Sequence, residues 1–137
     1  MIGTLLDSLR DARRRRVWEH SRAVGRRGED LAHRFLRKRG YVIVARNYRL
    51  PSGDGEADIV AWEGDHLVIV EVKTRESAEY GPPDRAIAPE KLRNMRRVAF
   101  EYSRKTDIPV EQIRFDVVGV VLGDPPDVTL FKGAHGR

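Results

Sequence analysis

The sequence contains no cysteine, and this absence excludes disulfide scaffolds, thiolate zinc sites, iron–sulfur clusters and cysteine nucleophiles together. Long apolar runs are also missing, because the longest, residues 67–70 and 117–122, are far too short to cross a bilayer. Asp7 and Arg10 interrupt the first leucines, so no early stretch has the apolar core of a signal peptide. We therefore expect a cytoplasmic protein with no membrane partner.

What the chain does contain is enough apolar material for one folded core. It has 137 residues, of which 40% are hydrophobic and 34% charged. That length favours a single domain, since two independently folded domains would each be small. The composition is unlike that of a disordered protein.

The positive charge is concentrated at the start of the chain. Residues 1–39 hold 12 basic and 5 acidic side chains, whereas the remainder holds 14 basic and 16 acidic ones. Such a basic region beside a mildly acidic body favours a polyanionic partner, with arginines neutralising phosphates. A solvated charged face is the alternative, and the run Arg13–Arg16 is also typical of a disordered basic arm.

Periodicity and turn residues predict a domain with one mixed sheet. Residues 1–23 show no clean period, and we interpret them as an N-terminal arm, partly disordered or helical, that precedes a domain over 24–137. The helices are predicted at 26–39 and 89–106, and the strands at 41–48, 56–63, 66–74, 114–122 and 127–132. This order indicates an α/β or α+β fold around one mixed sheet.

A hairpin in the middle of the chain carries the main candidate site. Gly64-Asp65 is a good two-residue turn, so Glu63 should pair with His66, and paired residue numbers should sum to 129. Asp58 then lies directly opposite Glu71. Like charges in that position destabilise a hairpin, which indicates that something compensates them.

Alternation along the strand places Lys73 on the same face as the two carboxylates. Both faces are otherwise apolar, which predicts an interior hairpin covered on both sides. This face carries Val60, Trp62, Leu67 and Ile69, and the other carries Ala57, Ile59, Ala61, Val68, Val70 and Val72. Oxygen ligands converging on one point suit Mg²⁺ or Mn²⁺. The alternative is an ordinary ion pair of Lys73 with Glu71 or with Glu56, and the residues alone leave both interpretations open.

Three other groups of residues are considered for function. Glu29 lies at the edge of the first helix's apolar stripe, where it either reaches toward the sheet or stays solvated beside an arginine. Asp116 lies among apolar residues, and we interpret it as a buried structural acid bonded to the backbone. The histidines are too scattered to suggest a zinc site; they are His20, His33, His66 and His135.

An ordered series of motifs over residues 24–133 makes the sequence similar to a known family. The motifs are Gly25-Arg-Arg-Gly-Glu29-Asp-Leu-Ala32, Asn47-Tyr48-Arg49, Gly55-Glu-Ala-Asp58-Ile59-Val60, Val70-Glu-Val-Lys73-Thr-Arg75, Pro89-Glu-Lys91-Leu-Arg93 and Arg114-Phe-Asp116-Val-Val118. In these it resembles the YraN-type family of uncharacterised bacterial proteins, which are similar to archaeal Holliday junction resolvases. This resemblance implies a relationship to the restriction-endonuclease-like, PD-(D/E)xK, nuclease superfamily. Ala57 stands where the superfamily motif has its proline.

The resemblance implies a restriction-endonuclease-like α/β fold, with a mixed five-stranded central sheet flanked by helices, and a set of site residues. Asp58 and Glu71 would be the metal carboxylates, Lys73 the catalytic lysine, and Glu29 an additional helix-borne acid that joins the catalytic and metal-binding set. It implies Mg²⁺ or Mn²⁺ as cofactor, and DNA as partner of a chain that can act as a homodimer. The residues expected to contact nucleic acid are Arg26, Arg27, Arg75, Lys91 and Arg93; for Lys91 and Arg93 a solvated helix face is equally compatible.

The first expectation is therefore a Mg²⁺- or Mn²⁺-dependent DNA endonuclease of the Holliday junction resolvase type. A second is a non-catalytic nucleic-acid-binding protein of the same fold, in which the carboxylates form only a structural ion cluster. A third is an assembly factor whose basic arm reaches a protein or ribosomal surface. A nuclease assay with and without metal separates the first from the other two.

Overall fold

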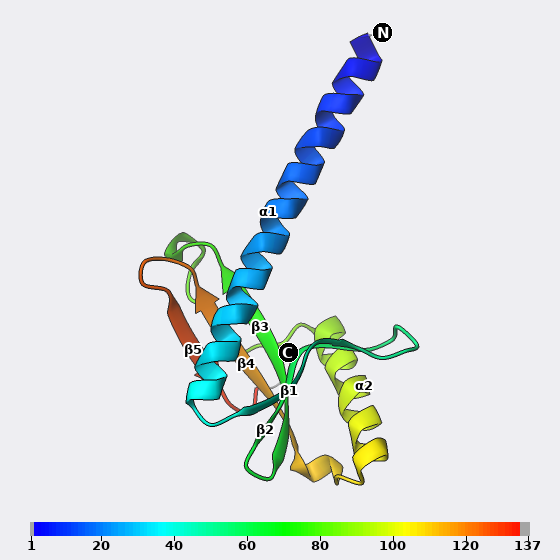
Figure 1. Ribbon diagram of the computed structural model, residues 1–137, viewed down its shortest axis with the longest axis vertical. Helices are drawn as coiled ribbons and strands as arrows, with labels where there is room; N and C mark the ends of the chain where they lie inside the picture. The colour runs from blue at the N-terminus through cyan, green and yellow to red at the C-terminus, as the bar shows by residue number, and fades with distance from the viewer. Residues whose placement is uncertain (1, 135–137) are drawn as a thin grey trace.

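The structure is a computed structural model that describes residues 2–134 (Figure 1). Its main elements follow in the order α1 (Ile2–Lys38), β1 (Val42–Arg49), β2 (Glu56–Glu63), β3 (His66–Arg75), α2 (Pro89–Thr106), β4 (Ile113–Val121) and β5 (Asp127–Phe131). Short 3₁₀ turns, η1 (Ala78–Tyr80) and η2 (Val110–Gln112), precede α2 and β4. The strands and α2 lie within one residue of their predicted bounds.

The five strands form one sheet in the order β1-β2-β3-β4-β5. Strands β3 and β4 are parallel, and every other neighbouring pair is antiparallel. A parallel pair needs a crossover connection, and α2 supplies it. Helix α1 packs on one face of the sheet and α2 on the other (Figure 1). The mixed sheet flanked by helices is thereby confirmed.

The β2–β3 hairpin has the predicted register. Its ladder runs from Glu63↔His66 to Ile59↔Val70, so paired numbers sum to 129. Beyond Ile59 the pairing stops, and Asp58 Oδ2 instead accepts a hydrogen bond from the Val72 backbone N–H at 2.8 Å. The hairpin thus opens at the two residues that the register places opposite each other, Asp58 and Glu71.

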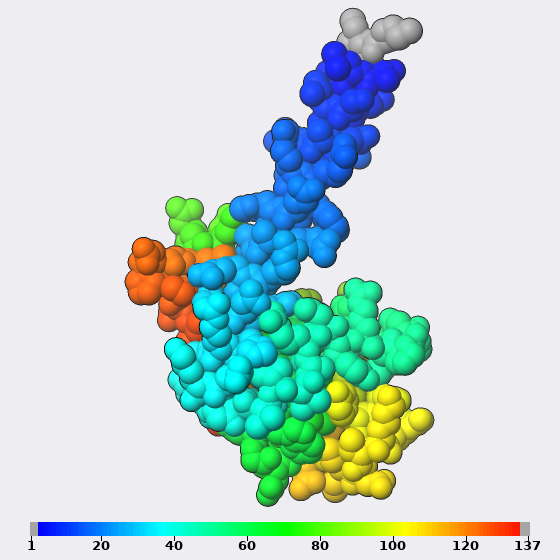
Figure 2. Space-filling model, viewed as in Figure 1, coloured from blue at the N-terminus to red at the C-terminus, as the bar shows by residue number. Residues whose placement is uncertain are grey.

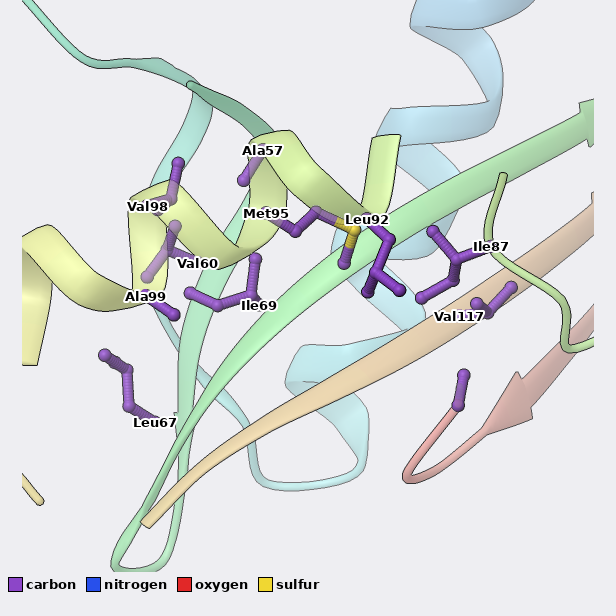
Figure 3. Close-up of a cluster of buried hydrophobic side chains, with 11 residues drawn as sticks. Ala57, Val60, Leu67, Ile69, Ile87, Leu92, Met95, Val98, Ala99 and Val117 are labelled. Atoms are coloured by element: carbon purple, nitrogen blue, oxygen red, sulfur yellow. The ribbon is translucent and has the colours of Figure 1, made fainter. Parts of the chain in front are cut away.

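Each face of the sheet has its own apolar cluster. On the α2 side, Val60, Leu67 and Ile69 belong to one buried cluster with Leu92 and Met95 of α2 (Figure 3). On the α1 side, the buried cluster contains Ala32, Leu36, Ile59, Ala61, Val68, Val70, Val72, Val118 and Val120. The predicted face is wrong for Ala57, which packs with the α2 cluster and not on the other face with Ile59. Strict alternation holds only along the regular ladder, which ends at Ile59.

Helix α1 is much longer than predicted. The expected start was Arg26, whereas the helix begins at Ile2 and projects beyond the body of the molecule (Figures 1 and 2). No proline interrupts residues 2–38, and arginine, leucine and alanine are good helix formers. The first half of α1 has no clean helical spacing of apolar residues, because it does not pack on the core. Gly40, with φ of +91°, follows the helix as its predicted stop.

Gly28 brings α1 into close contact with the sheet. A Cβ at this position would lie 2.7 Å from Thr74 Cγ2 of β3, so only glycine allows the helix to approach this closely. The next residue, Glu29, is thereby carried to the end of β3. Within residues 2–134 no helix is both long and apolar enough to cross a membrane.

Candidate functional site

Two carboxyl groups meet where the β2–β3 hairpin opens. Glu71 is only 5% exposed, and Asp58 is partly buried beside it. Burial raises the pKa of both groups, and the Asp58 charge adds to the shift that takes the pKa of Glu71 to about 7. Because the Asp58 charge acts on Glu71, the two carboxyl groups resist being ionised together. Two buried acids that resist joint ionisation are a feature of functional sites.

Lys91 in the first turn of α2 lies over this pair. Its Nζ donates to Glu71 Oε1 at 2.9 Å, while 61% of the Lys91 side chain remains exposed. Burial lowers the pKa of Lys91, but the hydrogen bond and the charge of Glu71 outweigh it and raise the pKa. From the sequence, Lys91 is expected to contact phosphate. In the structure it also donates a hydrogen bond to the Glu71 carboxylate. Pro89 marks the start of α2 in the sequence, so it already indicates that Lys91 lies in the first turn of the helix.

Lys73 has a different partner from those considered for an ion pair. Its Nζ donates to Asp84 Oδ1 at 2.6 Å, and Asp84 Oδ1 also accepts from the Ala86 backbone N–H at 3.1 Å. Asp84 lies in the loop between β3 and α2, and its position depends on the path of that loop. Lys73 therefore lies on the same face as Glu71 without neutralising it directly.

Glu29 approaches Asp58 from the α1 side. The pKa of Glu29 is raised, first by burial and also by the Asp58 charge, although a hydrogen bond to Asn47 opposes the shift. Arg46 Nη2 lies 3.9 Å from Glu29 Oε2. Asn47 has φ of +49°, a left-handed conformation that asparagine tolerates better than most residues. Carboxylates from α1, β2 and β3 thus interact in sequence: Glu29 with Asp58, and Asp58 with Glu71.

An open cleft gives access to the carboxyl pair. It has a volume of about 460 Å³ and is lined by Glu71, Lys73, Arg75 and Lys91, among others. A second hollow of about 440 Å³ lies on the α1 side of β3 and shares Arg75 in its lining. Both hollows are lined by residues from the carboxyl end of β3: Val72, Thr74 and Arg75. Cationic side chains therefore surround the approach to Glu71.

The donor set at Asp58 and Glu71 fits a hard divalent cation. Among residues 2–134, no three His, Cys, Asp or Glu side chains gather closely enough to form a metal-binding group by themselves. Mg²⁺ and Mn²⁺ do not require such a group, because Mg²⁺ is typically held by one or two carboxylates, several waters and substrate phosphates. A cation between Asp58 and Glu71 would also relieve the repulsion that raises their pKa values.

The other predicted contact residues are spread over two helices. Arg26 and Arg27 are exposed on α1, and Arg93 is exposed on α2, whereas Arg75 lines both hollows. The structure therefore brings Arg75 and Lys91 to the cleft and leaves the other three on helix surfaces. His20, on α1, contacts Glu76, and His135 lies outside the described residues.

Asp116 belongs to a separate buried network. It is fully buried and accepts hydrogen bonds from Tyr41 Oη at 2.9 Å, Arg114 Nε at 2.8 Å and the Gly133 backbone N–H at 3.1 Å. Arg114 also donates to Glu63 at 2.7 Å. Every acceptor of the acid is engaged within the fold, which agrees with its interpretation as a structural acid.

Comparison with known proteins gives one consistent family. A family model described as "Uncharacterised protein family UPF0102" matches residues 28–120. A UPF0102 protein of Solibacter usitatus is 46% identical over 134 residues, which cover 98% of this chain and 99% of that protein. UPF0102 proteins of Koribacter versatilis and Dictyoglomus turgidum are 45% and 34% identical, over 81% and 80% of this chain and 78% and 91% of their own lengths. The matched segment contains Glu29, Asp58, Glu71, Lys73 and Lys91.

Proposed function

The chain belongs to the UPF0102 family of uncharacterised proteins, and we propose that it is a metal-dependent endonuclease of the Holliday junction resolvase type that hydrolyses phosphodiester bonds in DNA. The observation that carries this proposal is the Asp58–Glu71 pair. Both carboxyl groups have raised pKa values, and Glu71 lines an open cleft with Lys73, Arg75 and Lys91. Structural carboxylates are normally satisfied inside the fold, as Asp116 is.

Asp58 and Glu71 would hold Mg²⁺ or Mn²⁺ through one or both of their oxygens. A cation bound there supplies Lewis-acid polarisation of a phosphoryl oxygen and a bound water of lowered pKa. Glu29 would be the additional helix-borne acid of this set, since its charge interacts with Asp58 from the α1 side. The Val72 N–H fixes the Asp58 carboxylate in place.

The cationic side chains bind and orient the phosphate. Lys91 is more than half exposed, so its ammonium can turn from Glu71 to a phosphate oxygen in the cleft. Lys73, held by Asp84, offsets negative charge that develops on the phosphoryl group. Arg75, which lines both hollows, donates to a neighbouring phosphate.

A nuclease assay on linear, flapped and four-way DNA, with and without Mg²⁺ or Mn²⁺, tests the proposal. We expect cleavage that requires the metal and is lost in Asp58→Asn. Glu90→Gln is the matched control, because Glu90 is an exposed acid next to Lys91 in the same helical turn. It should cleave as the wild type does.

The opposite outcome has a definite meaning. DNA binding without cleavage of any substrate in either metal would overturn the nuclease proposal. The non-catalytic nucleic-acid-binding protein of the same fold would then be the function that accounts for the basic cleft.

A further inference from the structure

The first half of α1 carries an exposed surface that the proposed nuclease site does not use. Residues 2–23, here called the overhang, project from the body of the molecule (Figures 1 and 2). A hollow of about 470 Å³ lies on the overhang, lined by Arg10, Arg13, Arg14, Val17, Trp18 and Ser21. Ser21 also lines the hollow between α1 and β3. The surface is therefore continuous with the side of α1 that faces the sheet.

Trp18 is the centre of this surface. Its side chain is 58% exposed, and the Arg22 guanidinium lies 4.6 Å from the ring centroid. The neighbouring Val17 is 60% exposed. The overhang holds six arginines and three acidic residues, so an apolar ring is placed within a net positive field. Flat aromatic rings among cationic side chains are the elements with which proteins bind unpaired nucleic acid strands.

We propose that the sheet-facing side of the overhang binds an unpaired nucleic acid strand, with a base stacked on Trp18 and phosphates on Arg10, Arg13 and Arg14. A duplex fits the arginines equally well, but its bases already stack on one another and offer no face to an indole. Only an unpaired strand uses both kinds of side chain. Charge complementarity with the arginines favours a polyanion over an apolar protein segment.

The path from the overhang to the cleft follows the hollows already described. Ser21 lines both the overhang hollow and the hollow on the α1 side of β3, and Arg75 lines both that hollow and the cleft at Glu71. A strand held on Trp18 therefore leads toward the candidate site. This direction rests on the proposed function, whereas binding at Trp18 itself does not.

Binding of labelled oligonucleotides by the full-length chain in EDTA tests the inference. The probes are an oligo-dT strand and a blunt duplex of the same length, followed by fluorescence anisotropy. Trp18→Ala should weaken binding of the single strand roughly five- to a hundredfold, which is the range expected for one stacked base. Duplex binding should change less than about twofold, since phosphate contacts dominate it. Trp18→Phe keeps a ring and should retain most of the single-strand affinity.

Phe100→Ala is the matched control. Phe100 is 60% exposed on α2, and the Arg104 guanidinium lies 5.9 Å from its ring centroid. Phe100 with Arg104 thus matches the exposed ring and guanidinium of Trp18 with Arg22, but it lies outside the overhang. We expect this variant to bind both probes as the wild type does.

Equal effects of Trp18→Ala on the two probes, or none, would overturn the proposal. So would a Trp18-dependent change seen only in self-association by ultracentrifugation or only in binding to anionic phosphatidylserine vesicles, which would assign the surface to a second copy or to a lipid headgroup. Cleavage is measured separately with metal. A failure to cleave DNA would therefore leave the strand-binding result in EDTA unaffected, and a failure of strand binding at Trp18 would leave the cleavage result unaffected.

Discussion

Replacing Glu71 by glutamine should remove a pH-dependent loss of stability. Burial and the Asp58 charge raise the pKa of Glu71 to about 7 in the folded chain, against an ordinary value of 4.5. The folded state thus keeps the proton that the unfolded chain releases. The stabilising effect of this proton on the folded state is complete below about pH 4.5 and is lost as the pH rises through 7. At about 1.4 kcal/mol per pKa unit, the loss of stability is at most about 3 to 4 kcal/mol.

Urea unfolding of the metal-free protein between pH 5 and pH 8.5 measures this effect. The free energy of unfolding of the wild type should fall over this range, and that of Glu71→Gln should fall much less. At pH 8 the variant should be more stable by about 3 kcal/mol, because the pKa of about 7 for Glu71 already includes the favourable hydrogen bond and charge of Lys91. Glu90→Gln, with its exposed side chain, should keep the wild-type profile. Parallel profiles for wild type and Glu71→Gln would refute the assignment of a protonated buried Glu71.

Other predictions concern metal, catalysis, the basic arm and helix packing. Asp58→Asn should lose most of the Mn²⁺ binding seen by calorimetry, and equal heats for both proteins would remove the metal site. Lys73→Ala should abolish cleavage while DNA affinity stays near that of the wild type, and unchanged cleavage would leave Lys73 as an ion-pair partner of Asp84 only. Deleting residues 1–16 should lower the slope of log DNA affinity against log salt concentration by roughly 1 to 3, because each neutralised phosphate contributes about 0.9. An unchanged slope would show that these residues are a solvated tail. Gly28→Ala should lower stability by about 1–3 kcal/mol, because the added methyl group would overlap Thr74. Gly25→Ala, whose methyl group would meet nothing within 4 Å, should raise stability by about 1 kcal/mol. Equal melting temperatures for the two variants would contradict the close approach of α1 to the sheet.

The fold could be predicted where local chemistry determines geometry. Gly64 has φ of +56°, as the predicted two-residue turn requires, and the turn then fixes the whole β2–β3 register. Pro89 begins α2 at the predicted residue, and Asp107, in a left-handed conformation, ends it. In both cases a few adjacent residues decide the outcome, so no knowledge of distant contacts was needed.

The parts that could not be predicted depend on distant segments. The pairing of Lys73 with Asp84 and of Lys91 with Glu71 requires the path of the loop between β3 and α2, which no local pattern specifies. The overhang is helical but covers no core, so it lacks the apolar period from which helices are recognised. Ala57 departs from its predicted face because alternation fails where the hairpin opens.

That opening explains why the carboxyl pair can serve a function at all. Had the ladder continued past Ile59, Asp58 and Glu71 would lie directly opposite each other on a closed hairpin, where their repulsion is purely destabilising. Instead, Asp58 Oδ2 takes the place of a strand carbonyl by accepting the Val72 N–H. One oxygen of Asp58 is thereby committed to the fold, while the Glu71 carboxylate beside it lines the cleft. The bond that maintains the hairpin is thus the bond that orients the candidate metal ligand.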